Sequence, residues 1–154
     1  MLIGEFRHQV DGKGRVAVPA QFRRGLPSGS VVSIGPEGRL VIRPPDAWAA
    51  LERNHQMNAE TPEQARRYLR TLYSSARELE TDAQGRMLLI EPHRRWASIS
   101  DRAVFVGLGS VVEVVGEGVW DGEQSGIDPA AFTELNDSVM TRTGAVPALI
   151  PPPA

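Results

Sequence analysis

The sequence predicts an α+β protein made of two similar halves, and three observations lead to that prediction. The segment Asp11–Val18 recurs 71 residues later as Asp82–Leu89. Short stretches with a period of two flank both copies, as β-strands require, and stretches with helical spacing follow them. Beyond the motif the match resumes after one extra residue, in the pairs Val32 and Val104, Ile34 and Val106, Gly35 and Gly107, Leu40 and Val112, Ile42 and Val114, and Trp48 and Trp120. We therefore interpret the chain as an internal duplication.

Four short strands are expected in each half. The alternating positions beside the first motif are Phe6, His8, Val10, Val16 and Val18. The second half repeats them, less cleanly before its motif, at Ala76, Glu78, Glu80, Met87 and Leu89. The remaining strands are predicted over Val31–Ile34, Leu40–Ile42, Ala103–Val106 and Val111–Val115. Gly35–Gly38 and Leu108–Ser110 are expected to connect them.

Helices are expected to close each unit. Pro45-Asp46 is a start signal, and Thr61–Gln64 is a stronger one, with Thr as the N-cap, Pro as the first helical residue and Gln completing a capping box. Asp128-Pro129 opens a last helix. Trp48 and Trp120 are expected in the core. Gly144, Pro147 and Pro151–Pro153 in the last segment of the chain predict a disordered tail.

The repeated D-x-x-G-R segment combines a turn with a recognition side chain. Asp between two strands caps the backbone N–H groups of a loop, and Gly adopts positive φ, so the loop-forming residues are predicted to be Asp11, Gly14, Asp82 and Gly85. The arginine fork can bind guanine O6 and N7 together, and Lys13 can reach a phosphate. A lone segment of this kind is more often a hairpin turn with a solvated arginine; its duplication favours a functional role.

Composition and charge limit the other functions. The chain has no cysteine, which excludes disulfides, thiolate zinc sites and cysteine nucleophiles. His8, His55 and His93 lack metal-ligand spacing, Gly107–Gly109 lacks the third glycine of a dinucleotide site, and Gly12–Gly14 is no phosphate loop. We therefore expect no catalytic residue, metal, cofactor or small-molecule substrate. The net charge of −2 weighs against nucleic acid, although residues 1–80 hold 12 basic and 9 acidic residues.

The N-terminus shows no apolar stretch of signal-peptide length, because Met1–Ile3 is followed by Gly4 and Glu5. The internal stretch Val111–Val115 is interrupted by Glu113 and is far too short to span a bilayer. These features predict a cytoplasmic protein without a membrane partner.

The chain resembles the MraZ family in Gly4–Phe6, in Asp11–Arg23, in Asp82–Arg86 and at Trp48 and Trp120. The resemblance covers all but the tail, and the ordered pair of D-x-K-G-R and D-x-x-G-R segments is specific. It implies two tandem AbrB-like (SpoVT-AbrB) units of the swapped-hairpin β-barrel type, in pseudo-twofold arrangement with flanking helices. It also implies a sequence-specific regulator, a repressor in our interpretation, of the division and cell-wall gene cluster, assembled into rings.

The corresponding domain prediction is a first unit over 1–58, a connecting helix over 59–76, a second unit over 77–140 and the tail over 141–154. The predicted partners are double-stranded DNA, in short direct repeats at the nucleoid, and further copies of the chain. The predicted DNA-binding residues are Arg7, Lys13, Arg15, Gln84 and Arg86.

Several points stay open. Proline follows Arg15 at Pro19 but follows Arg86 only at Pro92, so the placement of Arg94-Arg95 is open. Arg23-Arg24 and Arg94-Arg95 either track phosphates or lie on solvated helix faces. The alternative functions are a protein-interaction module of the AbrB or antitoxin type without direct DNA readout, and, with little support, an enzyme on a small barrel. The acidic second half favours the interaction module; the paired arginine loops favour DNA binding.

Overall fold

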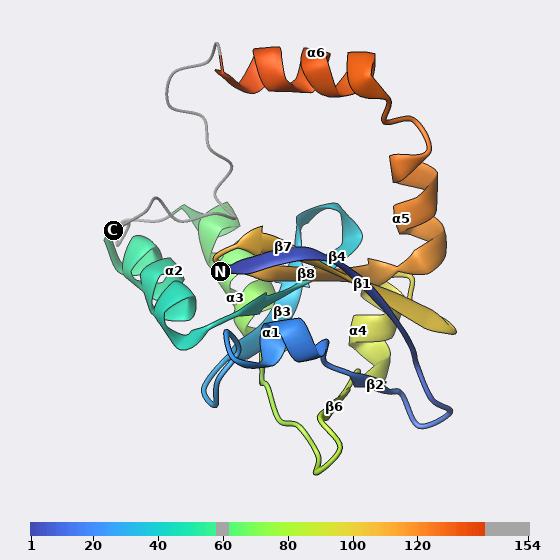
Figure 1. The fold of residues 1–154 in the computed structure, drawn as a ribbon. Helices are drawn as coiled ribbons and strands as arrows, with labels where there is room; N and C mark the ends of the chain where they lie inside the picture. The colour runs from blue at the N-terminus through green and yellow to red at the C-terminus, as the bar shows by residue number, and fades with distance from the viewer. Residues whose placement is uncertain (58–61, 141–154) are drawn as a thin grey trace.

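The computed structural model describes residues 1–57 and 62–140 and confirms the α+β class (Figure 1). The strands are β1 (Leu2–Gln9), β2 (Arg15–Ala17), β3 (Val31–Gly35), β4 (Arg39–Arg43), β5 (Arg77–Glu78), β6 (Arg86–Leu88), β7 (Arg102–Gly109) and β8 (Val112–Gly116). The helices are α1 (Ala20–Arg23), the 3-10 turn η1 (Pro36–Gly38), α2 (Pro45–Met57), α3 (Glu63–Ser75), α4 (Glu91–Trp96), α5 (Glu117–Gln124) and α6 (Pro129–Met140).

Strands of the two halves are interleaved within one antiparallel sheet, whose order is β1-β7-β8-β4-β3-β5. The equivalent strands of the two halves are β1 and β5, β3 and β7, and β4 and β8. Exchanging each strand for its equivalent gives the same order, read from the other edge of the sheet. β1 pairs with β7, and β5 pairs with β3, so each half supplies an edge strand to the other. The two short strands β2 and β6 pair separately. The duplication seen in the sequence is therefore an internal pseudo-symmetry of the sheet.

One hydrophobic core serves both halves. Leu40 and Ile42 of β4 lie opposite Val114 and Val112 of β8, and all four side chains are fully buried. Val16 and Met87, one from each half, face each other in the β2–β6 pair and are buried in the same cluster. A half of about 70 residues could bury little apolar surface alone, whereas the shared core buries both.

Several predicted details are corrected by the structure. Helix α3 begins at Glu63, with Pro62 at the N-cap position rather than at the first helical position; the predicted N-cap Thr61 lies outside the described residues. Trp48 and Trp120 are only half-buried and do not belong to the core. β7 extends to Gly109, so the predicted connection after it is shorter.

The last helix begins as predicted, because Asp128 Oδ1 accepts a hydrogen bond from Ala131 N at 2.8 Å. The second unit's strands also match the expected positions closely. The predicted tail lies outside the described residues.

A close backbone contact at the end of β8 gives a stability prediction. Gly116 N donates to Ala97 O at 2.8 Å, and a Cβ on Gly116 would overlap the backbone carbonyl of Ser98. Gly116→Ala is therefore expected to lower the free energy of unfolding by about 1–3 kcal/mol in urea denaturation. Gly118→Ala, two residues later in α5 with open space around its Cβ, is the matched control and should be neutral or slightly stabilising. Equal unfolding free energies for the two variants would contradict this account of the contact.

Candidate functional site

The first D-x-x-G-R loop is closed by one carboxylate. Asp11 Oδ1 accepts hydrogen bonds from Lys13 N and Arg15 N, both at 2.9 Å, and Oδ2 accepts from Arg15 Nε at 3.1 Å. Gly14 adopts φ +81°, a backbone conformation that favours glycine, and its N–H donates to Asp11 O at 3.0 Å. Asp11 therefore caps the backbone N–H groups of the loop and Gly14 supplies its positive φ, while the side chain of Arg15 adds one more bond to the same carboxylate.

The second loop has the same geometry. Asp82 Oδ1 accepts from Gln84 N at 3.0 Å and Arg86 N at 2.9 Å, while Oδ2 accepts from Arg86 Nε at 2.9 Å. Gly85 adopts φ +75°. Gln84 thus stands where Lys13 stands in the first loop, and both side chains are exposed.

The two loops form one structural unit. β2 and β6 pair from Arg15 opposite Leu88 to Ala17 opposite Arg86, just after the two turns. Further backbone bonds join the halves, with Val18 N donating to Gly85 O at 3.0 Å and Leu89 N donating to Gly14 O at 2.8 Å.

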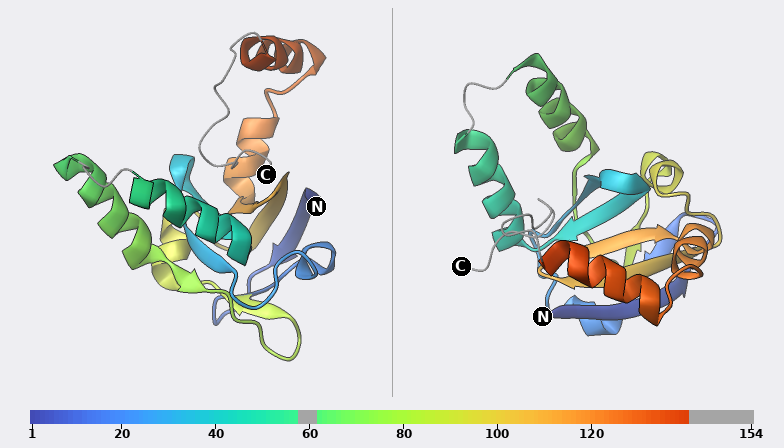
Figure 2. Two further views of the ribbon diagram at one scale, coloured as in Figure 1. Left: turned by 90° about the vertical axis from the view of Figure 1, so that its left-hand side faces the viewer. Right: turned by 90° about the horizontal axis from the view of Figure 1, so that it is seen from above.

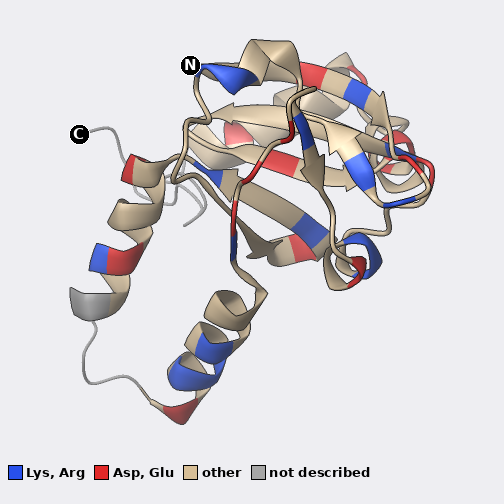
Figure 3. Ribbon diagram, turned by 90° about the horizontal axis from the view of Figure 1, so that it is seen from below, with Lys and Arg blue, Asp and Glu red and all other residues tan. Residues whose placement is uncertain are grey.

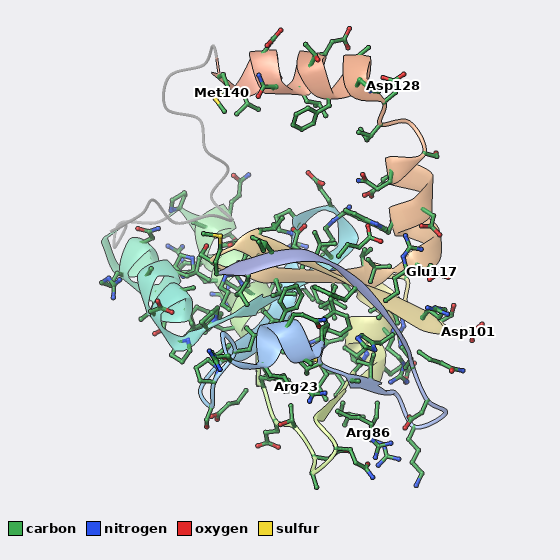
Figure 4. The ribbon with its side chains drawn as sticks, in the orientation of Figure 1. Arg23, Arg86, Asp101, Glu117, Asp128 and Met140 are labelled. Atoms are coloured by element: carbon green, nitrogen blue, oxygen red, sulfur yellow. The ribbon has the colours of Figure 1, made fainter. Side chains whose placement is uncertain are left out.

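Arg86 Nη1 also lies 3.6 Å from Asp11 Oδ2, which links the second loop to the first. Both loops project on the side of the molecule opposite α6 (Figure 1), and Figure 4 shows Arg86 at this edge. Two equivalent loops from distant segments therefore lie side by side.

Each loop is also covered by an arginine from the other half. Arg23 of α1 donates from Nε to Val18 O at 3.1 Å, and its guanidinium lies so close to Gly85 that a Cβ there would be 2.8 Å from Arg23 Cζ. Arg94 of α4 occupies the equivalent place over Gly14 and donates to Leu89 O. Their arrangement was not predicted, but both arginines follow the loop arginine by eight residues, which is the signal that the sequence offers.

The loop carboxylates are held in the ionised state. Hydrogen bonding from the backbone N–H of Arg15 is the main cause that lowers the pKa of Asp11, and that of Arg86 does the same for Asp82. The negative charge of each loop carboxylate is therefore balanced by the arginine of the same loop. Lys13 adds an exposed positive charge to the first loop, and the second loop has no equivalent charge.

Arg7 lies away from the loops, on β1. Its guanidinium contacts Asp121 at 2.8 Å, Glu5 at 2.9 Å and Glu117 at 3.4 Å. The hydrogen bond to Asp121, followed by that to Glu5, raises the pKa of Arg7. Its charge is therefore matched within the chain, between β1 and α5.

Within the described residues, no group of three His, Asp or Glu side chains gathers in a way that could hold a metal ion. Over the same ranges, the helices are all too short or too polar to cross a membrane. Figure 3, which views the loop side, shows acidic and basic residues intermixed there.

The fold and the site together define a class: an internally duplicated α+β protein that presents two equivalent Asp–Gly–Arg loops on one side. Residues 1–70 match the family described as "MraZ protein, putative antitoxin-like". The chain is 35% identical to the transcriptional regulator MraZ of Desulforamulus reducens, over 91% of this chain and 98% of that protein. Identity to the protein of the same name is 37% in Natranaerobius thermophilus (91% and 97% covered) and 38% in Desulfitobacterium hafniense (78% and 84% covered).

The chain therefore belongs to the MraZ family, as the resemblance indicated. The names of these relatives describe transcriptional regulators, and this confirms the prediction that the protein is not an enzyme.

Proposed function

We propose that this protein is a transcriptional regulator that binds double-stranded DNA through its two loops. The observation that carries the proposal is the equivalence of the loops: two distant segments repeat one hydrogen-bond pattern and are tied together on one side of the molecule. The relatives' names support regulation of transcription. The strand order also supports assignment of the fold to the tandem swapped-hairpin type.

In this proposal Arg15 and Arg86 read base edges. Arginine presents a planar fork that matches the two acceptors of guanine in the major groove. Because the Nε of each arginine is bound by its own loop carboxylate, its guanidinium is oriented before DNA arrives. Preorganisation of this kind lowers the entropic cost of binding.

Lys13 and Gln84 distinguish the loops. The exposed Lys13 contacts a phosphate, whereas Gln84 contributes hydrogen bonds without charge. Residues 5–24 carry five basic and two acidic residues, and residues 77–95 carry four of each. The first loop therefore supplies most of the electrostatic attraction. Arg7 also contributes to this electrostatic attraction of DNA in our proposal, although its ion pairs with Glu5, Glu117 and Asp121 weaken that contribution.

Affinity in this proposal comes from several copies acting together. A chain with a net charge of −2 and two small loops makes few contacts with DNA, so copies held in register along the duplex raise affinity by avidity. A ring with loops on one face fits short direct repeats spaced near one helical turn, about 10 base pairs. We further propose that the protein represses the division and cell-wall gene cluster at the nucleoid, as the family resemblance implies.

Replacing Lys13 tests the electrostatic role of the first loop. Lys13→Ala is expected to reduce the slope of log affinity against log salt by about one unit per bound loop, because one phosphate contact is lost. Fluorescence anisotropy with a duplex of the protein's own upstream region, over a range of salt concentrations, measures the slope. Gln84→Ala, at the equivalent position, is the matched control and should leave the slope unchanged. Identical slopes for the two variants would refute the assigned role of Lys13.

A further inference from the structure

A cavity of about 240 Å³ lies beside the second loop, at the edge of the sheet that β5 forms. In Figures 1 and 2 the chain passes from the end of α3 through β5 into this loop. The buried side chains that line the cavity are those of Val32 on β3, Leu79 just after β5, Met87 on β6 and His93 on α4. Its floor is therefore apolar, apart from one imidazole ring.

The equivalent place in the first half is filled by aromatic rings. Phe6 lies opposite Phe105 in the β1–β7 pair. Phe6 and Phe22 pack edge to face with ring centroids 5.1 Å apart, and the rings of His8 and Phe105 do so at 6.2 Å. Phe22 and Phe105 are fully buried. Aromatic packing therefore joins β1, α1 and β7 at this position.

The second half has lost these rings. At the offset of 71 residues that relates the two loops, Arg77 takes the place of Phe6 and lies opposite Val32 in the β5–β3 pair. By the same offset, His93 takes the place of Phe22. One phenyl ring is thus replaced by an exposed, flexible side chain and another by a smaller imidazole. The space that rings fill in the first half is a cavity in the second.

The rim of the cavity carries two carboxylates and one guanidinium. Among the residues that the structure describes, the side chains of Glu78 and Glu80 have no hydrogen bond or ion pair. The guanidinium of Arg77 is held at the end of α3, because it donates to the backbone carbonyls of Ser74 and Ala76 at 3.1 and 2.8 Å. The rim is therefore net negative, and its carboxylates are available to a cation.

His93 adds no charge to the floor of the cavity. Its Nε2 donates to Ser75 O at 2.7 Å, which fixes the ring between α4 and the end of α3. Burial lowers the pKa of His93, so the imidazole is neutral near pH 7 and does not repel a cation. A neutral imidazole also offers a ring face or edge against which another ring can pack.

We propose that this cavity binds a small aromatic amine, in which a single ring carries a protonated amino group. The ring packs against Val32, Met87 and His93, as the aromatic side chains of the first half pack against one another, and the amino group lies at the carboxylates of the rim. The volume suits one ring, since an apolar cavity of about 150 Å³ already binds benzene, whereas drug-sized ligands occupy about 300 Å³ or more. The proposal does not depend on DNA binding by the loops.

Nuclear magnetic resonance of the full chain, with phenethylamine as the probe, tests the proposal. Titration is expected to give saturable shifts at the methyl group of Met87 and the ring of His93, and none at the methyl group of Met140 on α6. The neutral analogue 2-phenylethanol should bind roughly 2- to 5-fold more weakly, because it loses one exposed ion pair. The anion 3-phenylpropionate should bind most weakly of the three.

Two replacements of one residue separate the cavity from the charge at its rim. Arg77→Phe supplies the ring that Phe6 provides in the first half, so it should fill the cavity and abolish the saturable shifts. Arg77→Ala, the matched control, removes the same charge and leaves the cavity open, so it should bind phenethylamine at least as tightly as the unaltered protein. Circular dichroism checks that both variants fold.

Replacing the carboxylates gives a test that stands even if Arg77→Phe does not fold. With Glu78→Gln and Glu80→Gln together, phenethylamine and 2-phenylethanol should bind equally, because the rim no longer selects a cation. Shifts that do not saturate, or that persist in folded Arg77→Phe, would overturn the proposal. Equal affinity of the unaltered protein for the amine and the alcohol would do the same. Saturation by N-acetylphenylalaninamide but not by phenethylamine would assign the cavity to an aromatic side chain of a protein partner instead.

Discussion

Arg15→Ala and Arg86→Ala should each weaken binding to a specific duplex by about 1–3 kcal/mol, or roughly 5- to 150-fold. Each arginine ends a loop that its own aspartate closes, and each guanidinium is fixed in direction by the bond from Nε. Removal of the side chain takes away the fork that reads guanine while the core stays unaltered. Arg86→Ala should have the larger effect, because Arg86 also pairs with Asp11 across the two loops at 3.6 Å.

Anisotropy titrations with specific and shuffled duplexes measure this effect, and urea unfolding confirms that the variants fold. Arg86→Lys is the informative control. Lysine keeps the charge but has no bidentate fork, so it should retain affinity for the shuffled duplex and lose preference for the specific one. Unchanged specific affinity in both folded alanine variants would rule out base reading by these arginines.

Arg39→Ala is expected to destabilise the protein by about 3 kcal/mol, the largest effect on stability that we predict. Arg39 is nearly buried, lies 3.5 Å from the largely buried Glu113 and pairs with Glu123 of α5. Burial raises the pKa of Glu113, and the neighbouring Arg39 opposes that rise. Loss of Arg39 leaves the carboxylate of Glu113 buried between the central strands without its main cation.

The test compares the unfolding free energies of Arg39→Ala and the double variant Arg39→Ala with Glu113→Gln near neutral pH. Neutralising Glu113 removes the unpaired buried charge, so the double variant should recover part of the lost stability. Arg95→Ala is a control, because its ion pair with Glu91 lies on the surface, where such pairs contribute about 0–1 kcal/mol. If Arg39→Ala lowers the free energy of unfolding as little as Arg95→Ala does, the Arg39–Glu113 pair contributes no more than a surface ion pair and the prediction is wrong.

The sequence was informative about local structure, because period and turn chemistry act over a few residues. The alternation around Val16 and Met87 predicted β2 and β6, and the D-x-x-G-R segments predicted both turns. The pairing of β1 with β7 could not be read from these patterns, since each strand is compatible with many neighbours until the core selects one. The helix signal at Thr61–Gln64 predicted α3 correctly, with its start displaced by one residue because Pro62 occupies the cap position.

The site was predictable in its turns and not in its cross-connections. Duplication identified equivalent positions such as Lys13 and Gln84, but not the crossing of Arg23 to Gly85 and Arg94 to Gly14. Those contacts depend on how the halves exchange strands. The ion pairs of Arg7 could not be predicted either, because Asp121 is distant in sequence and it is helix α5 that brings it close to β1.

The central claim is that the paired loops bind specific double-stranded DNA. The most direct measurement is an anisotropy titration of the full chain, at fixed physiological salt, against a duplex of its own upstream region and a shuffled duplex of equal length. The account predicts tighter binding to the upstream duplex by at least about 10³-fold, the lower range for specific over non-specific binding, with that preference abolished when Arg15 and Arg86 are both replaced by alanine. Equal affinity for the two duplexes, or a preference that survives the double replacement in a folded protein, would contradict it.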